Sequence, residues 1–191
     1  MRKIIVAMQV TLDGFIEGPK GELDWAMKED AETWKEVFEL HDSADTLLLG
    51  RVMYPAFEKY WLSVLSGRHG SENEIAYAKR ADKMQKLLFS TTVSSVEWET
   101  TRIIKDNVEG EMRKMKQQSG KNMLMLGGAG LVSSFMNSGL VDEIHLLINP
   151  VILGGGKPLF GNLNKRERLH LISSKILASG KVAVHYHLAE C

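Results

Sequence analysis

Apolar runs that end in glycine or hydroxyl residues alternate with amphipathic segments over the first two-thirds of the chain. An apolar run of about four to eight residues is typical of a buried strand, and apolar residues at helical spacing are typical of a helix that packs on one face. The strands predicted in this region cover residues 3–10, 46–51, 86–90, 101–104 and 122–126. The predicted helices cover residues 30–41, 52–65, 75–80, 108–118 and 131–138.

The last third of the chain has the pattern of β-strands. Residues 141–149 form an apolar run, whereas residues 168–176 and 182–188 alternate between apolar and polar side chains. Gly180 lies between the two alternating segments, so we predict that they pair as an antiparallel hairpin. Residues 150–160 are predicted to be a run that ends in a flexible glycine loop.

The order of these elements predicts the fold class. Strands that alternate with helices pair in parallel through right-handed crossovers. We therefore predict a single α/β domain over residues 1–191, to which the terminal hairpin adds antiparallel strands. Ligands of such sheets bind at the carboxyl ends of the strands, so we expect the binding residues to lie at those ends.

Composition and charge exclude several classes of protein. The 24 basic and 24 acidic residues give zero net charge, which is not the basic excess of a general nucleic-acid binder. No run approaches the ~20 apolar residues of a membrane span, and the apolar run near the N-terminus is too short for a signal peptide. The single cysteine, Cys191, excludes an internal disulfide and fits a reducing compartment. We expect a cytoplasmic protein that binds neither nucleic acid nor a membrane.

The stretch from residue 122 to residue 132 combines a strand, a glycine turn and the start of a helix. Gly127, Gly128 and Gly130 let the backbone approach a ligand closely. The first N–H groups of the helix point at that ligand, with the positive end of the helix dipole behind them. This combination favours a phosphate group. The alternative is that the glycines only permit a sharp strand-to-helix turn.

Two further strand ends carry groups that suit a phosphate or a ribose. Gly50 and Arg51 follow one buried strand and precede a helix, although a solvated arginine is the alternative there. Ser90 and Thr91 follow the next strand, where hydroxyl groups suit a ligand or a turn equally well. Three such termini together favour a phosphate-containing ligand more than any one of them does.

Five motifs spread over nearly the whole chain carry a family resemblance. They are Leu12-Asp13-Gly14-Phe15-Ile16, Leu47-Leu48-Leu49-Gly50-Arg51, Leu126-Gly127-Gly128-Ala129-Gly130, Gly139-Leu140-Val141-Asp142-Glu143 and the run 149–160. With them the chain resembles the dihydrofolate reductase superfamily, and within it the branch of the riboflavin-biosynthesis reductase C-terminal domain. The run 149–160 is the most diagnostic, because dihydrofolate reductases proper lack its glycine-proline pattern. The resemblance implies a three-layer α/β/α fold with a mixed, mostly parallel eight-stranded sheet.

The resemblance also implies NADPH, with NADH as the alternative, bound across the strand ends. The implied cofactor-binding residues are Gly127, Gly128, Ala129, Gly130 and Leu131 at the pyrophosphate, Gly50 and Arg51 at the adenosine phosphates, Ser90 and Thr91 at the 2′-phosphate side, and Phe15 and Ile16 at the nicotinamide. The residues implied to border the substrate are Trp25, Trp34 and Asn149.

Three positions depart from the family pattern. Relatives often place an arginine where Thr91 stands, which leaves less charge here for a 2′-phosphate. Met53 replaces a common threonine, which removes one hydroxyl from the pyrophosphate site. Asp30 and Glu32 come one turn before the first-helix acid of dihydrofolate reductases, which disfavours dihydrofolate as the substrate.

The implied activity is hydride transfer from NADPH to a small heterocycle, similar to that of a 5-amino-6-(5-phosphoribosylamino)uracil reductase. The alternatives are a pterin or dihydrofolate-type reductase, and a non-catalytic nucleotide-binding protein that keeps the fold. The expected partner is a small-molecule substrate. The ten methionines and the apolar terminal strands also permit a homodimer.

No residue is assigned as the proton donor. Asp13, Asp24 and Asp30 are the nearest acids, but their sequence contexts favour a turn former, a surface residue and a helix cap, and a bound water could serve instead. His145, His185 and His187 lie on two predicted strands, where histidines are more often packed or solvent-facing than metal-bound. We therefore predict no metal site.

Overall fold

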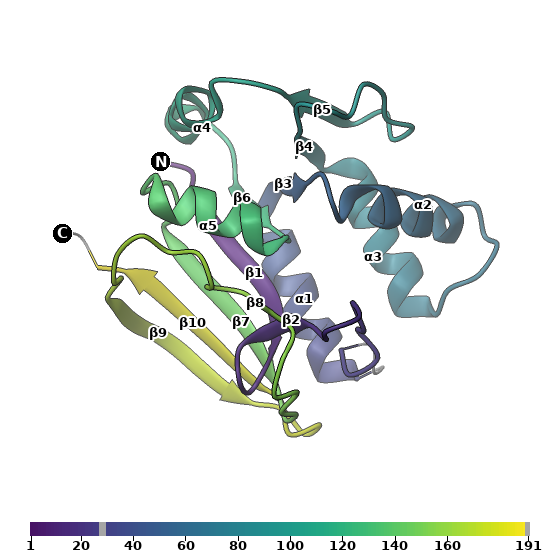
Figure 1. Cartoon of the computed structure of the whole chain (residues 1–191). Helices are drawn as coiled ribbons and strands as arrows, with labels where there is room; N and C mark the ends of the chain where they lie inside the picture. Colours follow the sequence, from purple (N-terminus) through teal and green to yellow (C-terminus); the bar gives the residue numbers. More distant parts are fainter. Residues whose placement is uncertain (27–29, 190–191) are drawn as a thin grey trace.

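The computed structural model describes residues 1–26 and 30–189, and its elements follow the chain in a mostly alternating order (Figure 1). The strands are β1 (Ile4–Thr11), β2 (Phe15–Glu17), β3 (Ala44–Gly50), β4 (Gln85–Phe89), β5 (Thr101–Ile104), β6 (Asn122–Met125), β7 (Glu143–Asn149), β8 (Lys157–Pro158), β9 (Leu169–Ile176) and β10 (Val182–Leu188). The helices are α1 (Ala31–Asp42), α2 (Tyr54–Leu65), α3 (Glu72–Lys83), α4 (Val108–Gln117) and α5 (Ala129–Asn137).

Within the described residues, eight of these strands form one sheet in the order β5-β4-β3-β6-β1-β7-β10-β9. The six strands from β5 to β7 pair in parallel, whereas β10 is antiparallel to both β7 and β9. The predicted fold class is confirmed, including the eight-stranded, mostly parallel sheet and its antiparallel C-terminal pair. The parallel pairing brings the carboxyl ends of six strands to one edge of the sheet.

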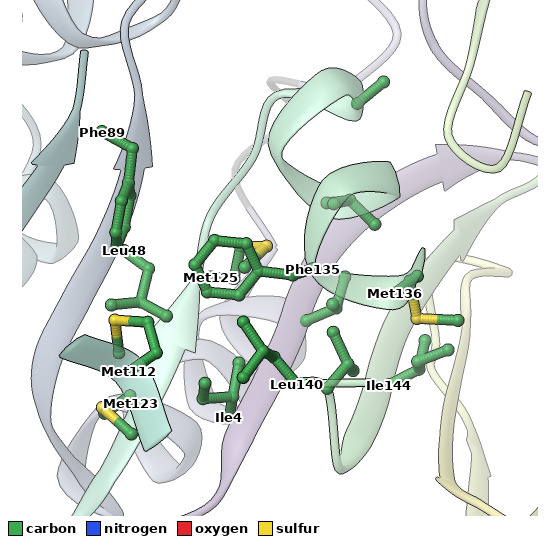
Figure 2. Close-up of a cluster of buried hydrophobic side chains, with 14 of the residues drawn as sticks. Ile4, Leu48, Phe89, Met112, Met123, Met125, Phe135, Met136, Leu140 and Ile144 are labelled. Carbon is green, nitrogen blue, oxygen red and sulfur yellow. The ribbon is translucent and has the colours of Figure 1, made fainter. Parts of the chain in front are cut away.

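Helices cover both faces of the sheet and give three layers. On one face, α4 and α5 pack their apolar side chains on β1, β3, β4 and β6. Figure 2 shows Phe135 of α5 pointing into this cluster, where its ring lies 5.1 Å from that of Phe89 and approaches it edge-on. On the other face, α1, α2 and α3 contribute an aromatic-rich cluster that includes Trp34, Tyr54 and Tyr77.

Three local features differ from the sequence-based prediction. The stretches predicted as loops after β1 and after β7 pair with each other as β2 and β8. Helix α3 begins earlier than predicted, because Ser71 and Glu74 form a capping box at its N-terminus. A bulge interrupts the β9–β10 hairpin, so β9 does not alternate regularly against its partner. Among the described residues, no helix is long and apolar enough to cross a membrane.

Candidate functional site

A groove of about 430 Å³ lies at the edge of the sheet where the parallel strands end. The ends of β3, β4 and β5 with the residues that follow them, the start of α4, the first two turns of α5 and one residue of β8 form its walls. They are Gly50, Arg51, Val52, Phe89, Ser90, Thr91, Ile104, Lys105, Val108, Gly128, Ala129, Gly130, Leu131, Ser134, Phe135 and Lys157. The groove therefore draws on segments that are distant in sequence and that the sheet topology brings together.

The N-terminus of α5 faces this groove through the glycine turn. Gly128 is the N-cap residue and has no side chain to cap the helix. The N–H of Leu131 donates to the carbonyl oxygen of Gly128 at 3.0 Å, whereas the N–H groups of Ala129 and Gly130 have no hydrogen-bond partner among the described residues. The N–H of Gly50 donates to the carbonyl oxygen of Gly127 at 3.0 Å. A Cβ atom on Gly50 would lie 3.2 Å from the nitrogen of Gly128, a tight contact that the neighbouring turn would have to relieve by a few tenths of an ångström, so glycine favours the close approach of the two turns.

The charge of the groove is positive. Arg51, Lys105 and Lys157 are among its lining residues, and none of the lining residues is acidic. Lys157 forms an ion pair with Glu17 at 3.1 Å, whereas Arg51 and Lys105 have no carboxylate partner among the described residues. Together with the α5 dipole, these cations attract an anion.

The remaining walls are hydroxyl-bearing or apolar. Ser90 accepts hydrogen bonds from the N–H groups of Thr92 at 3.2 Å and Val93 at 2.9 Å, so it stabilises the turn after β4 and can still donate its own O–H. Thr91 is exposed beside it, and Phe89, Ile104 and Phe135 supply apolar surface. Such a mixture suits a ligand with both an aromatic ring and phosphates.

The structure brings eight of the residues predicted to bind a cofactor into this one groove. They are Gly50, Arg51, Ser90, Thr91, Gly128, Ala129, Gly130 and Leu131. Gly127 does not line the groove, but its carbonyl oxygen accepts a hydrogen bond from the N–H of Gly50, which does. Phe15 and Ile16 do not line the groove. They lie in β2, which pairs with β8 next to Lys157, and Ile16 is buried in the core.

The residues predicted to border the substrate lie outside the groove. Trp34 is on α1, where it stacks on Phe38 at a ring separation of 5.5 Å. Asn149 ends β7 opposite Thr11, and its Nδ2 donates to the carbonyl oxygen of Val10 at 3.2 Å. The indole Nε1 of Trp25 and the Oδ1 of Asn149 are buried and have no hydrogen-bond partner among the described residues.

The acids considered as proton donors have structural partners. The carboxylate of Asp13 accepts from the Thr11 hydroxyl and from the N–H groups of Leu153 and Gly154, which lowers its pKa and ties the β1–β2 turn to the glycine loop. Asp30 is the N-cap of α1. Burial raises its pKa, but hydrogen bonds from Ser179 and Thr33 outweigh this and lower it to about 2. Asp24 lies in the turn before α1.

The histidines of the C-terminal strands pair with carboxylates and with each other. The Nε2 of His185 lies 2.9 Å from Glu143, and the His145 and His185 rings are 5.4 Å apart. His187 stacks on His170. The part of the chain that the structure describes contains no group of three or more potential ligands that could hold a metal ion.

Sequence reasoning missed two of the three cations in the groove. Lys105 directly follows β5, so the strand-end argument applied to Arg51 could have found it. Lys157 reaches the groove only because β8 pairs with β2. No local sequence signal predicts that pairing.

The comparisons with known proteins place the chain in a family. The family model of the RibD C-terminal domain matches residues 2–184, so the chain belongs to this family. The uncharacterized protein YyaP of Bacillus subtilis (strain 168) is 35% identical over 186 residues, which cover 97% of this chain and 95% of YyaP. The predicted family is therefore confirmed.

Two solved structures illustrate the breadth of the fold. A diaminohydroxyphosphoribosylaminopyrimidine deaminase/5-amino-6-(5-phosphoribosylamino)uracil reductase of Thermotoga maritima has a TM-score of 0.71 at 14% identity, over 98% of this chain and 57% of its own. Dihydrofolate reductase of Enterococcus faecalis, in a complex with NADP(H), has a TM-score of 0.60 at 13% identity, over 98% of this chain and 97% of its own. At these identities the likeness extends to the fold alone.

Proposed function

We propose that this protein is an NADPH-dependent reductase that transfers a hydride to a small heterocycle of the ribosylamino-pyrimidine kind. The observation that carries the proposal is the groove at the strand ends. It combines three cations, no acidic lining residue and the uncapped N-terminus of α5. A dinucleotide requires such an anion site beside apolar surface.

The residues of the groove fit the cofactor. A Cβ atom added to Gly128 or Gly130 would have no other atom within 4 Å, so there is open space where a pyrophosphate would approach the backbone. In the proposed complex the N–H groups at the start of α5 and Arg51 bind the phosphates. Ser90, Thr91 and Lys105 bind the 2′-phosphate side. When bound, the reduced nicotinamide supplies the hydride, and the protein supplies orientation and a dry pocket.

The family and two unpartnered polar atoms support a heterocyclic substrate. A relative by fold is a 5-amino-6-(5-phosphoribosylamino)uracil reductase. Buried polar atoms normally have hydrogen-bond partners, yet the Trp25 Nε1 donor and the Asn149 Oδ1 acceptor have none among the described residues. Each of these atoms is a candidate partner for a polar group of the substrate.

An activity assay tests the proposal. Purified protein is mixed with NADPH and each candidate substrate in turn, and the loss of reduced-nicotinamide absorbance is followed. We expect turnover with 5-amino-6-(5-phosphoribosylamino)uracil and much slower turnover with dihydrofolate. Faster turnover with dihydrofolate would instead identify a pterin-type reductase. NADPH binding without turnover of any substrate would identify a non-catalytic nucleotide-binding protein, and either result would overturn the proposal.

Lys105 is expected to select NADPH over NADH. It follows β5 beside the Ser90–Thr91 turn and has no carboxylate partner among the described residues, so it supplies the charge that Thr91 lacks. We expect Lys105→Gln to weaken NADPH binding by about tenfold, the size of one charge-assisted phosphate contact, and to leave NADH binding nearly unchanged. Calorimetric titration with each cofactor measures both effects.

Lys157→Gln is the matched control for Lys105→Gln. Lys157 lines the same groove, but its charge is offset by Glu17. We expect a smaller loss of affinity that is similar for the two cofactors. A loss in Lys105→Gln that is equal for NADPH and NADH would show that Lys105 does not recognise the 2′-phosphate.

A further inference from the structure

Gln9 places an unused hydrogen-bond donor near the carboxyl end of β1. The residue is half-buried. Its Nε2 has no hydrogen-bond partner among the described residues, and it does not belong to the buried atoms that lack one. The N–H groups of this amide are therefore open to a ligand. Ligands of parallel sheets bind at the carboxyl ends of the strands, and Gln9 lies two residues before the end of β1.

The place of Gln9 in the sheet sets it near the glycine turn of the groove, on the side of α1. Strand β1 lies between β6, which leads into that turn, and β7. The neighbouring Met8 reaches the turn, because a Cβ atom on Gly127 would lie 3.0 Å from the Cε of Met8. Successive residues of a strand point to opposite faces, so Gln9 points away from Met8. Gln9 pairs in register with Leu147, and Val37 of α1 packs on that face of the sheet.

Asn149 fixes the orientation of the Gln9 amide. Asn149 is 2% exposed, and its Nδ2 donates to the carbonyl oxygens of Val10 and Leu147 at 3.2 and 3.3 Å. These two backbone acceptors decide which end of the Asn149 amide is the nitrogen. The same Nδ2 lies 3.3 Å from the amide of Gln9, so the Gln9 atom that faces it is the oxygen, Oε1. The Nε2 of Gln9 consequently faces away from Asn149 as a donor.

We infer that Nε2 of Gln9 donates a hydrogen bond to a ring carbonyl oxygen of the heterocycle, and that Asn149 positions this donor. The inference rests on the proposed function, and it narrows the substrate to a heterocycle with a ring carbonyl group. A ring that presents an amino group at this point would set one donor against another and leave both unpaired. A site built around a hydrogen bond rejects an analogue that cannot make it. Gln9 therefore selects carbonyl-bearing rings over amino-substituted rings.

Calorimetric titration of the full chain with two pyrimidines, in the presence of saturating NADP+, tests this selection. Diaminouracil carries two ring carbonyl groups, and tetraaminopyrimidine carries amino groups in their place. We expect the wild-type protein to bind diaminouracil about tenfold more tightly than tetraaminopyrimidine. In Gln9→Glu the carboxylate keeps an oxygen for Asn149 but presents an acceptor to the ring, so the preference is expected to reverse. A preference that Gln9→Glu leaves unchanged would overturn the inference.

Two further variants separate recognition from charge and from folding. Ile152→Glu adds the same charge at a residue that is 68% exposed after β7, and it is expected to keep the wild-type preference. Asn149→Ala frees the Gln9 amide to rotate, so the preference is expected to shrink. If Asn149 had only a structural role, this variant would have a lower melting temperature and an unchanged preference, which would contradict its role in positioning Gln9.

NADPH titration distinguishes failure of this inference from failure of the proposed function. Gln9 does not line the groove, so the affinity for NADPH is expected to be unchanged in Gln9→Glu. A wild-type protein that binds NADPH but neither pyrimidine would overturn the inference about Gln9 alone. A wild-type protein that does not bind NADPH would overturn the proposed function.

Discussion

Replacing Gly130 by aspartate is expected to weaken NADPH binding by about 100-fold without unfolding the protein. Gly130 is exposed in the first turn of α5, and a Cβ atom there meets nothing within 4 Å. A carboxylate in the first turn favours the helix dipole, so stability is expected to stay unchanged or rise by up to ~1 kcal/mol. The same charge repels a pyrophosphate a few ångströms away by roughly 3 kcal/mol, which corresponds to a loss of about 100-fold in affinity.

Gly130→Asn separates charge from size. Asparagine has nearly the shape of aspartate but no charge, so we expect Gly130→Asn to retain most of the NADPH affinity that Gly130→Asp loses. Thermal melting checks that both variants are folded, and titration calorimetry measures the affinity. Equal affinities of the two variants would mean that α5 does not face the phosphates of the cofactor.

Replacing Lys86 by methionine is expected to give the largest loss of stability. Lys86 is fully buried, and its Nζ donates to the carbonyl oxygens of Ala81 and Met84 and to the Thr100 hydroxyl at 2.6, 3.0 and 2.6 Å. Nζ also lies 3.9 Å from the centre of the Trp98 ring. Methionine fills the space but leaves these acceptors at the end of α3 without their donor, at an expected cost of about 2–4 kcal/mol in the free energy of unfolding. Denaturant unfolding at neutral pH measures it.

The loss of stability in Lys86→Met is also expected to depend on pH. Burial lowers the pKa of Lys86 from its usual 10.5 to about 8. Between these values the unfolded chain keeps a proton that the folded chain has released, so the contribution of Lys86 to stability increases as the pH rises through this window. The stability difference between wild type and Lys86→Met should therefore grow above pH 8. Lys83→Met, at the exposed last residue of α3, is the control and should show neither effect.

Apolar periodicity predicted the main elements because a buried strand or helix face requires apolar residues at regular positions within its own segment. Strands such as β1 and β3 are buried on both faces, so their sequences are continuous apolar runs. The β2–β8 pair could not be predicted in this way, because its few residues are held by a partner far along the chain. The bulge in the β9–β10 hairpin likewise depends on the pairing, and no local signal marks it.

The position of the groove could be predicted from the sequence to the extent that it follows from the strand ends. Gly50, Arg51 and the glycine turn at 127–130 carry both a local signal and a position fixed by the parallel sheet. Lys105 also lies at the end of a parallel strand, but its neighbours Asp106 and Asn107 are polar, so the local sequence is that of an ordinary surface loop. The substrate side could not be derived from local pattern, because tertiary packing decides whether Trp34 faces a ligand or its aromatic neighbours.

Titration of the wild-type protein with NADPH tests the central claim most directly. If the groove at the carboxyl ends of the strands is a nicotinamide-dinucleotide site, NADPH binds saturably at one site per chain. This binding weakens with added salt and is about 100-fold weaker in Gly130→Asp. Absence of binding by both NADPH and NADH, or binding that Gly130→Asp leaves unchanged, would contradict the account.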